Sequence, residues 1–165
     1  MACFAQASVA MHSGRSVDAI TILKNRPKGK QYHDFYFLDY MLGLAKLYRQ
    51  DSDAAFHMNK YVNNFKGRLY IKECHQRIAW HYLLQGDMEG YNRHMELVKT
   101  KGYASSDPDK KALKEANSSE IPNDKILKIR LLFDGGYYDK ATAFMNQLSE
   151  DNFSSDKEKL EFTYR

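Results

Sequence analysis

The sequence predicts an all-α protein: a right-handed α-α superhelix of about four helical hairpins with one short inserted helix. Two observations lead to this prediction. Apolar residues recur at intervals of three and four along most of the 165 residues, and no stretch alternates with period two long enough to predict a strand. In addition, a short turn followed by a small or aromatic residue occurs four times, which indicates internal repeats.

The repeated turns define the units. Their key positions and the residues five places later are Gly14 and Ala19, Gln50 and Ala55, Gly86 and Tyr91, and Gly136 and Ala141. The last residues of these pairs are 36, 36 and 50 positions apart, so a constant period with one insertion of about 14 residues accounts for them. We expect one solenoid over 1–165, a piece of a longer array. Its units are 1–30, 31–66, 67–100 and 123–153, with an insertion at 101–122 and the start of a further unit at 156–165.

Each unit reads as two amphipathic helices. The first unit begins with the apolar segment Met1–Met11. This segment lacks the positively charged stretch that opens a targeting signal, so it predicts a helix that ends at Gly14. The apolar positions of the later units are Phe37, Leu38, Met41, Leu42, Ala45, Leu47, Ala55, Met58, Tyr61, Val62 and Phe65; Cys74, Ile78, Ala79, Tyr82, Met88, Tyr91, Met95 and Val98; and Ile126, Ile129, Leu132, Phe133, Ala141, Phe144, Met145 and Leu148.

The turns and small residues indicate close packing. Glycine tolerates positive φ after a helix, which lets the next helix return antiparallel to the first. A mid-helix glycine costs about 1 kcal/mol relative to alanine, so Gly43 predicts a contact that tolerates no larger side chain. Tyr91 stands where a small residue is expected. We therefore expect it to be buried, to face Ala79 and to splay the helices of the third unit.

The insertion has its own pattern. Ser106 and Asp107 precede Pro108, which suits the first position of a helix, and a narrow apolar stripe of Ala112, Leu113 and Ala116 follows. These residues predict a short extra helix. It is either a spacer packed on the side of the solenoid or a functional segment, because insertions in repeat proteins map to one face.

Two sets of segments carry a resemblance to known proteins. The first set is Leu42–Ala45, Gln50–Ala55, Ala79–Tyr82, Gln85–Glu89 and Gly136–Ala141, and the second is Phe35–Gly43, Leu131–Tyr138 and Asp156–Arg165. The first set resembles degenerate tetratricopeptide repeats, and the second resembles the C-terminal part of larger uncharacterised bacterial proteins of that class. The resemblance covers nearly the whole chain, although Tyr91 replaces an expected alanine and no proline closes the units. It implies the superhelix and a concave groove that binds a protein or peptide.

The residues that often do chemistry form no recognisable site. His75 and His81 point about 120° apart on a helix, no HExxH motif occurs, and Cys3 and Cys74 lack CxxC spacing. Nucleotide-binding and nucleophile motifs are absent too. We therefore expect no metal, no cofactor and no enzymatic activity. No apolar run approaches the roughly 18 residues of a membrane span, so no transmembrane segment is expected.

The formal net charge of +4 falls short of what a dedicated nucleic-acid binder carries, so no nucleic-acid partner is expected. Basic loops at Asn25–Lys30 and Lys66–Arg68 keep a nucleic-acid-binding module as the weakest alternative. The favoured reading is a non-enzymatic scaffold that holds a protein or peptide in its concave groove. A purely architectural spacer in a larger assembly, such as one in the cell envelope, is the main alternative.

The first helices of the units would line that groove. The composition of twelve tyrosines and one tryptophan suits a recognition surface, because amphipathic aromatic residues dominate binding sites. Phe37, Leu44 and Ile126 are expected to serve packing between repeats. The apolar end formed by Leu160, Phe162 and Tyr164, with the apolar start of the chain, predicts self-association through terminal repeats. The candidate groove residues are Tyr40, Tyr48, Glu73, Gln76, Trp80 and Arg130.

Overall fold

The computed structural model describes residues 2–118 and 120–164, and over these ranges it contains helices, turns and loops without any strand. The all-α prediction is confirmed. Met1 and Arg165, at the ends of the first and last predicted units, and Ser119 in the predicted insertion lie outside the described residues.

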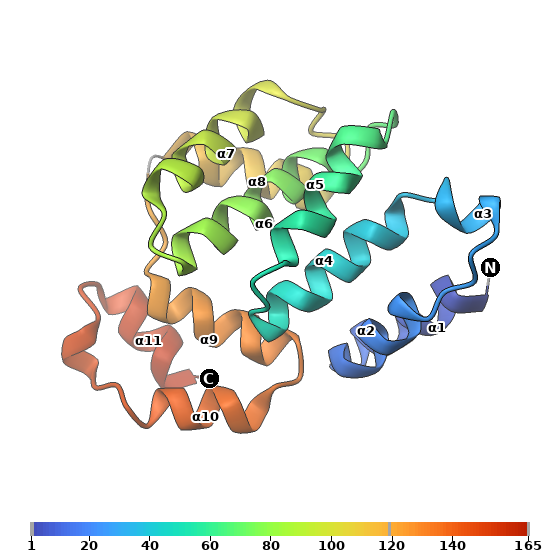
Figure 1. Cartoon of the computed structure of the whole chain (residues 1–165). Helices are drawn as coiled ribbons and strands as arrows, with labels where there is room; N and C mark the ends of the chain where they lie inside the picture. Colours follow the sequence, from blue (N-terminus) through green and yellow to red (C-terminus); the bar gives the residue numbers. More distant parts are fainter. Residues whose placement is uncertain (1, 119, 165) are drawn as a thin grey trace.

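The helices pack in neighbouring pairs (Figure 1). The pairs are α1 (Ala2–His12) with α2 (Ser16–Lys24), α4 (Phe37–Arg49) with α5 (Ala54–Asn64), α6 (Ile71–Leu84) with α7 (Met88–Thr100), and α9 (Asp124–Asp134) with α10 (Tyr138–Met145). The predicted inserted helix is α8 (Asp107–Ser118), and the pattern at the end of the chain forms α11 (Asp156–Tyr164) after the 3₁₀ turn η1 (Glu150–Asn152). The short helix α3 (Lys30–His33) was not predicted.

The four repeated turns share one backbone conformation. Gly14, Gly86 and Gly136 have φ values of 65°, 76° and 77°, in the left-handed region that glycine tolerates. Gln50 occupies the corresponding position of the second hairpin with φ 66°. The equivalence of the turns therefore holds even where the residue is not glycine.

Close approach between paired helices explains Gly43. A Cβ atom added there would lie 2.9 Å from the backbone nitrogen of Met58 and 3.1 Å from the carbonyl oxygen of Ala54, so alanine would not fit without a shift. In the third hairpin Tyr91 is buried, as predicted. The predicted splay of α6 against α7 stays a prediction.

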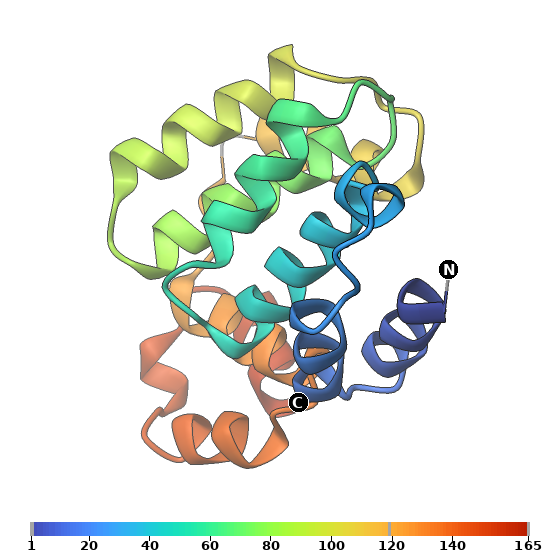
Figure 2. The same cartoon turned by 45° about the vertical axis from the view of Figure 1, so that its right-hand side comes forward.

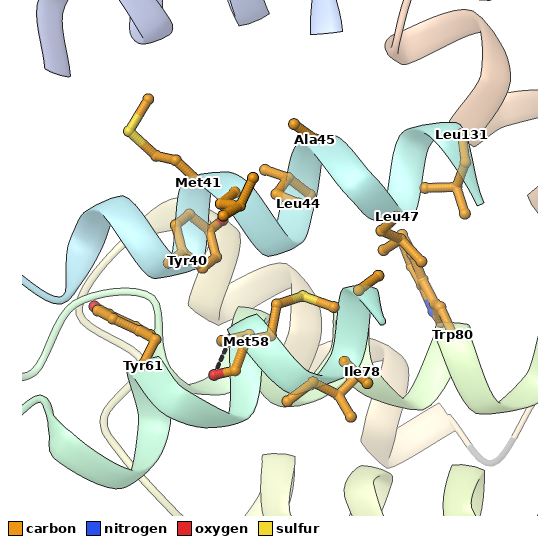
Figure 3. Packing of buried hydrophobic residues seen from close by; sticks show 14 of the residues in the cluster. Tyr40, Met41, Leu44, Ala45, Leu47, Met58, Tyr61, Ile78, Trp80 and Leu131 are labelled. Atoms are coloured by element: carbon orange, nitrogen blue, oxygen red, sulfur yellow. Dashed lines mark hydrogen bonds between the residues drawn. The ribbon is translucent and has the colours of Figure 1, made fainter. Parts of the chain in front are cut away.

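The core lies where α4, α5 and α6 meet, and much of the aromatic content is there. Figure 3 shows Trp80 beside Leu47 and Leu131, with Met58 of α5 facing α4. Phe37 and Tyr40 stack with ring centroids 5.1 Å apart, so many tyrosines and phenylalanines contribute packing rather than surface. Leu44 and Ile126 are buried, and Phe37 packs partly buried against the cluster, in agreement with the packing role expected of them.

The fourth hairpin packs against the first helices of the second and third hairpins. Helix α9 contacts α4 and α6, and α9, α10 and α11 lie together at one end of the molecule in both views (Figures 1 and 2). The turn between α9 and α10 meets the turn between α1 and α2. There the backbone N–H of Ser16 donates a hydrogen bond to the carbonyl oxygen of Gly135 at 3.4 Å. Residues more than a hundred positions apart are thus joined through glycines.

Both ends of the described chain leave apolar side chains in contact with solvent. Val9 of α1 is 58% exposed and Leu160 of α11 is 70% exposed, whereas Phe162 packs on Phe153 with ring centroids 4.7 Å apart. Self-association through these ends stays a prediction.

Candidate functional site

One face of α6 carries three of the six predicted groove residues. Glu73, Gln76, Arg77 and Trp80 follow the i, i+3, i+4, i+7 spacing that places side chains on a single face of a helix. Tyr40 of α4 joins them from the neighbouring hairpin. We call these five residues the α6 groove.

A buried polar network connects α4 to α6 in the groove. The hydroxyl of Tyr40 donates a 2.6 Å hydrogen bond to Glu73, and the guanidinium of Arg77 donates one of 2.9 Å to the other oxygen of that carboxylate. Burial, reinforced by the negative charge of Glu73, raises the pKa of the Tyr40 hydroxyl well above its usual value. Tyr40 therefore stays protonated and remains a donor over the physiological pH range.

Arg77 also stacks on the only tryptophan. Its guanidinium carbon lies 4.2 Å from the centroid of the Trp80 ring, which is cation–π geometry. The Nε atom of Arg77 is buried and has no hydrogen-bond acceptor among the described residues. The groove thus holds a donor that its own polar network leaves unused.

The inserted helix α8 covers this face. Glu115 of α8 accepts a hydrogen bond from Trp80 Nε1 at 2.7 Å with one carboxylate oxygen and from Gln76 Nε2 at 2.7 Å with the other. Ala112 and Ala116 are buried on the inner side of α8, while Leu113 of the predicted apolar stripe is only half-buried. The insertion therefore packs on the groove side of α6.

A second carboxylate of α8 caps α6 from outside that helix. Asp109 is fully buried and accepts hydrogen bonds from the backbone N–H groups of Tyr70 at 3.0 Å and Glu73 at 3.1 Å. Tyr70, at the start of α6, has φ 57° and no side-chain cap of its own, so Asp109 supplies the acceptor that the helix N-terminus requires. Ser106 caps α8 as predicted, since the Asp109 N–H donates to its hydroxyl oxygen at 3.2 Å.

The six predicted groove residues are therefore placed in three ways. Tyr40, Glu73, Gln76 and Trp80 come together and are all buried, with partners inside the chain. Tyr48 is half-buried at the end of α4 beside Gly135, and burial raises the pKa of its hydroxyl. Arg130 of α9 forms a two-pronged ion pair with Glu161 of α11 at 3.1 and 2.9 Å.

Three residues of this site were missed by sequence reasoning. Arg77 lies on the predicted helix face, and its i+4 spacing from Glu73 is a signal that could have found it. Asp109 follows Ser106 by three positions, as in a capping box. Nothing in the sequence separates Glu115 from the other charged residues of the insertion.

Two hollows flank α8. One, of about 240 Å³, is lined by Glu115, Ile121 and residues of α9 and α11; the other, of about 290 Å³, is lined by Tyr91, Met95 and Glu115. Tyr91 thus lies beside the insertion, and burial with the nearby Glu115 raises the pKa of its hydroxyl to about 12. The inserted helix does not fill the space between its neighbours.

Two histidines of the third unit, His75 and His94, form a pair that the sequence did not predict. His75 and His94 are buried with their Nδ1 atoms 3.3 Å apart, and burial lowers the pKa of each to about 4. Cys3 and Cys74 are buried free thiols on different helices. The described residues contain no group of three or more histidine, cysteine, aspartate or glutamate side chains placed to hold a metal ion. None of their helices is long and apolar enough to cross a membrane.

Comparison with known proteins gave no relative. A scan against protein-family models, a search of curated proteins and a search of solved structures each found no match to this chain.

Proposed function

We propose that this chain is a non-enzymatic scaffold that binds a protein or peptide in the concave groove of a tetratricopeptide-like stack of helical hairpins. In this proposal the first three hairpins form the right-handed superhelix, with α4 and α6 on its concave side. The observation that supports it is the seating of α8: a helical segment lies on α6 and is held by side chains of the groove.

The chemistry of the groove supports binding of a polypeptide. Tyrosine, tryptophan and arginine are the residue types that contribute most to binding energy at interfaces. Tyr40, Arg77 and Trp80 supply all three within one network, and Trp80 and Gln76 point hydrogen-bond donors toward the segment that covers them. Such a surface recognises a folded segment through side-chain hydrogen bonds as well as through apolar area.

The test is a pull-down with the full chain and two variants. The groove variant, Tyr48→Ala with Trp80→Phe, changes one predicted groove residue at the end of α4 and one residue of the α6 groove, and it keeps an aromatic ring at the buried position. Phe56→Ser changes an exposed side chain of α5 as a matched control. We expect the groove variant to lose its partner and the control to retain it, with both folded by circular dichroism. If both variants retain every partner, the groove proposal fails and the architectural role is favoured.

A further inference from the structure

Resting on the proposed function, we infer that the α6 groove receives an acidic amphipathic helix from a protein partner, and that α8 is an internal occupant which such a helix displaces. The argument has three parts: the donors that the groove presents, the poor fit of α8, and the way in which α8 is tethered.

The groove presents donors to whatever covers it. Trp80 Nε1 and Gln76 Nε2 lie in its middle, and the N-terminus of α6 presents the backbone N–H groups of Tyr70 and Glu73. The partial positive charge of a helix N-terminus adds to these donors. The complementary ligand therefore carries two carboxylates.

Helix α8 shows the spacing that fits. Asp109 and Glu115 are six residues apart, which is about 9 Å along a helix axis. Asp109 meets the start of α6 and Glu115 meets its middle, so α8 runs in the same direction as α6. A displacing helix needs an acidic residue in its first turn and another six residues later.

The internal occupant is small for its site. Its fully covered side chains besides Asp109 are Ala112 and Ala116, and hollows of about 240 and 290 Å³ remain beside it. Ala116 lines the hollow of about 290 Å³, so a helix with leucine at that position would fill part of this hollow and bury more apolar area.

The tether allows α8 to leave. The segment before it includes Lys101, Gly102, Tyr103 and Ser105, all exposed. It is held by a 3.2 Å hydrogen bond from Ser105 to the carbonyl oxygen of Arg68, by the Arg68 guanidinium 4.6 Å from the centroid of the Tyr103 ring, and by the close approach of Gly102 to Ile71. The contacts between α6 and α7 do not run through this segment. Undocking of α8 therefore leaves the third hairpin paired.

The experiment measures binding of a labelled peptide to the full chain. The peptide spans residues 105–118 with leucine in place of the alanine that lines the hollow of about 290 Å³, A116L, and a second peptide also carries D109N and E115Q. The receptor is either the unchanged chain or a release variant, Asp109→Ala with Glu115→Ala, which alters only α8. Lys110→Ala with Lys114→Ala, on the exposed side of α8, is the matched control.

We expect the leucine peptide to bind the release variant about tenfold or more tightly than it binds the unchanged chain or the control, because α8 no longer competes. The neutralised peptide should bind the release variant at least about thirtyfold more weakly than the acidic one, because it leaves the two backbone donors without a carboxylate acceptor. Equal binding of the acidic and neutralised peptides, or no binding of either to a folded release variant, overturns the inference.

Hydrogen exchange of the unchanged chain keeps the inference testable if the release variant does not fold. Amides of α8 should exchange about tenfold or more faster than those of α6, because α8 opens locally. Equal protection of α8 and α6 would show that α8 leaves only on global unfolding, which also overturns the inference. The two proposals can fail separately. If the groove variant loses a partner in the pull-down but no peptide binds the release variant, the proposed function holds and the inference of an acidic helix as the ligand fails.

Discussion

The contact between the first and fourth hairpins can be tested with one methyl group. Gly136 has φ 77°, and a Cβ atom added there would overlap the carbonyl group of Gly14, with its carbon 2.6 Å away. Gly86 occupies the same position in the third hairpin with φ 76°, yet an added Cβ would meet no atom within 4 Å. Gly136→Ala and Gly86→Ala therefore carry the same cost of placing alanine at a positive φ. They differ only in that the new methyl group at position 136 meets the Gly14 backbone.

The two effects can be estimated separately. Alanine in the left-handed conformation costs about 1 to 2 kcal/mol, and the reduced freedom of its unfolded chain offsets about 0.4 to 1 kcal/mol. Gly86→Ala should therefore lower the free energy of unfolding by about 1 kcal/mol. Gly136→Ala must also push the Gly14 backbone away, which is an overpacking cost of about 1 to 3 kcal/mol. Its total should be about 2 to 4 kcal/mol.

Urea unfolding followed by circular dichroism and by fluorescence of the single Trp80 measures both variants. For an m-value of about 2 kcal/mol/M, the midpoint should fall by about 0.5 M for Gly86→Ala and by about 1 to 2 M for Gly136→Ala. Equal midpoints would refute the reasoning, because they would mean that the first and fourth turns do not touch. The fourth hairpin would then extend an open stack instead of meeting the first.

Three further predictions concern stability. Tyr91→Ala should destabilise the chain by about 2 to 4 kcal/mol in urea, as expected for emptying a large buried side chain, and an unchanged midpoint would contradict its buried position. His75 and His94 have folded pKa values of about 4 against about 6.5 unfolded, so the unfolded chain binds more protons and stability falls as the pH drops through this window. Urea titrations should show a loss of about 2 kcal/mol per imidazole between about pH 7.5 and 5, smaller in His94→Gln. Gln50→Gly should raise the free energy of unfolding by about 0.5 to 1 kcal/mol and the melting temperature with it, because glycine relieves the left-handed strain at φ 66°. A lower melting temperature would argue against that strain.

The local structure was accessible from the sequence because it depends on short spacings. Helical periodicity and the repeated turn predicted paired helices, the buried Tyr91 and the close approach at Gly43. Ser106 before Pro108 predicted the start of α8. Each of these features is decided by residues within a few positions of one another.

The long-range arrangement was not accessible in this way. The meeting of Gly14 with Gly136 depends on how the first and fourth hairpins are oriented, and no periodicity encodes that. The pairing of His75 with His94 depends on how α6 and α7 face each other within one hairpin, which the spacing of the histidines does not reveal.

Three of the six predicted groove residues, Glu73, Gln76 and Trp80, lie on one face of α6, and the binding role of the six stays a prediction. The burial of these three residues was not foreseen, because the sequence does not say that Glu115 returns to that face.

The cap supplied by α8 links the stability of α6 to the selectivity of the groove. When α8 leaves, the N–H groups of Tyr70 and Glu73 lose their carboxylate acceptor and must be satisfied by water or by the incoming segment. A helix without an acidic first turn would cover these donors without pairing them, at a cost of about 1 to 3 kcal/mol for each buried unpaired group. Two such groups correspond to roughly a thirtyfold to twenty-thousandfold difference in affinity, since 1.4 kcal/mol is a factor of ten. Discrimination against neutral helices therefore comes from the donors that they leave unpaired, so Asp109 both completes α6 and sets the chemistry that a competitor must match.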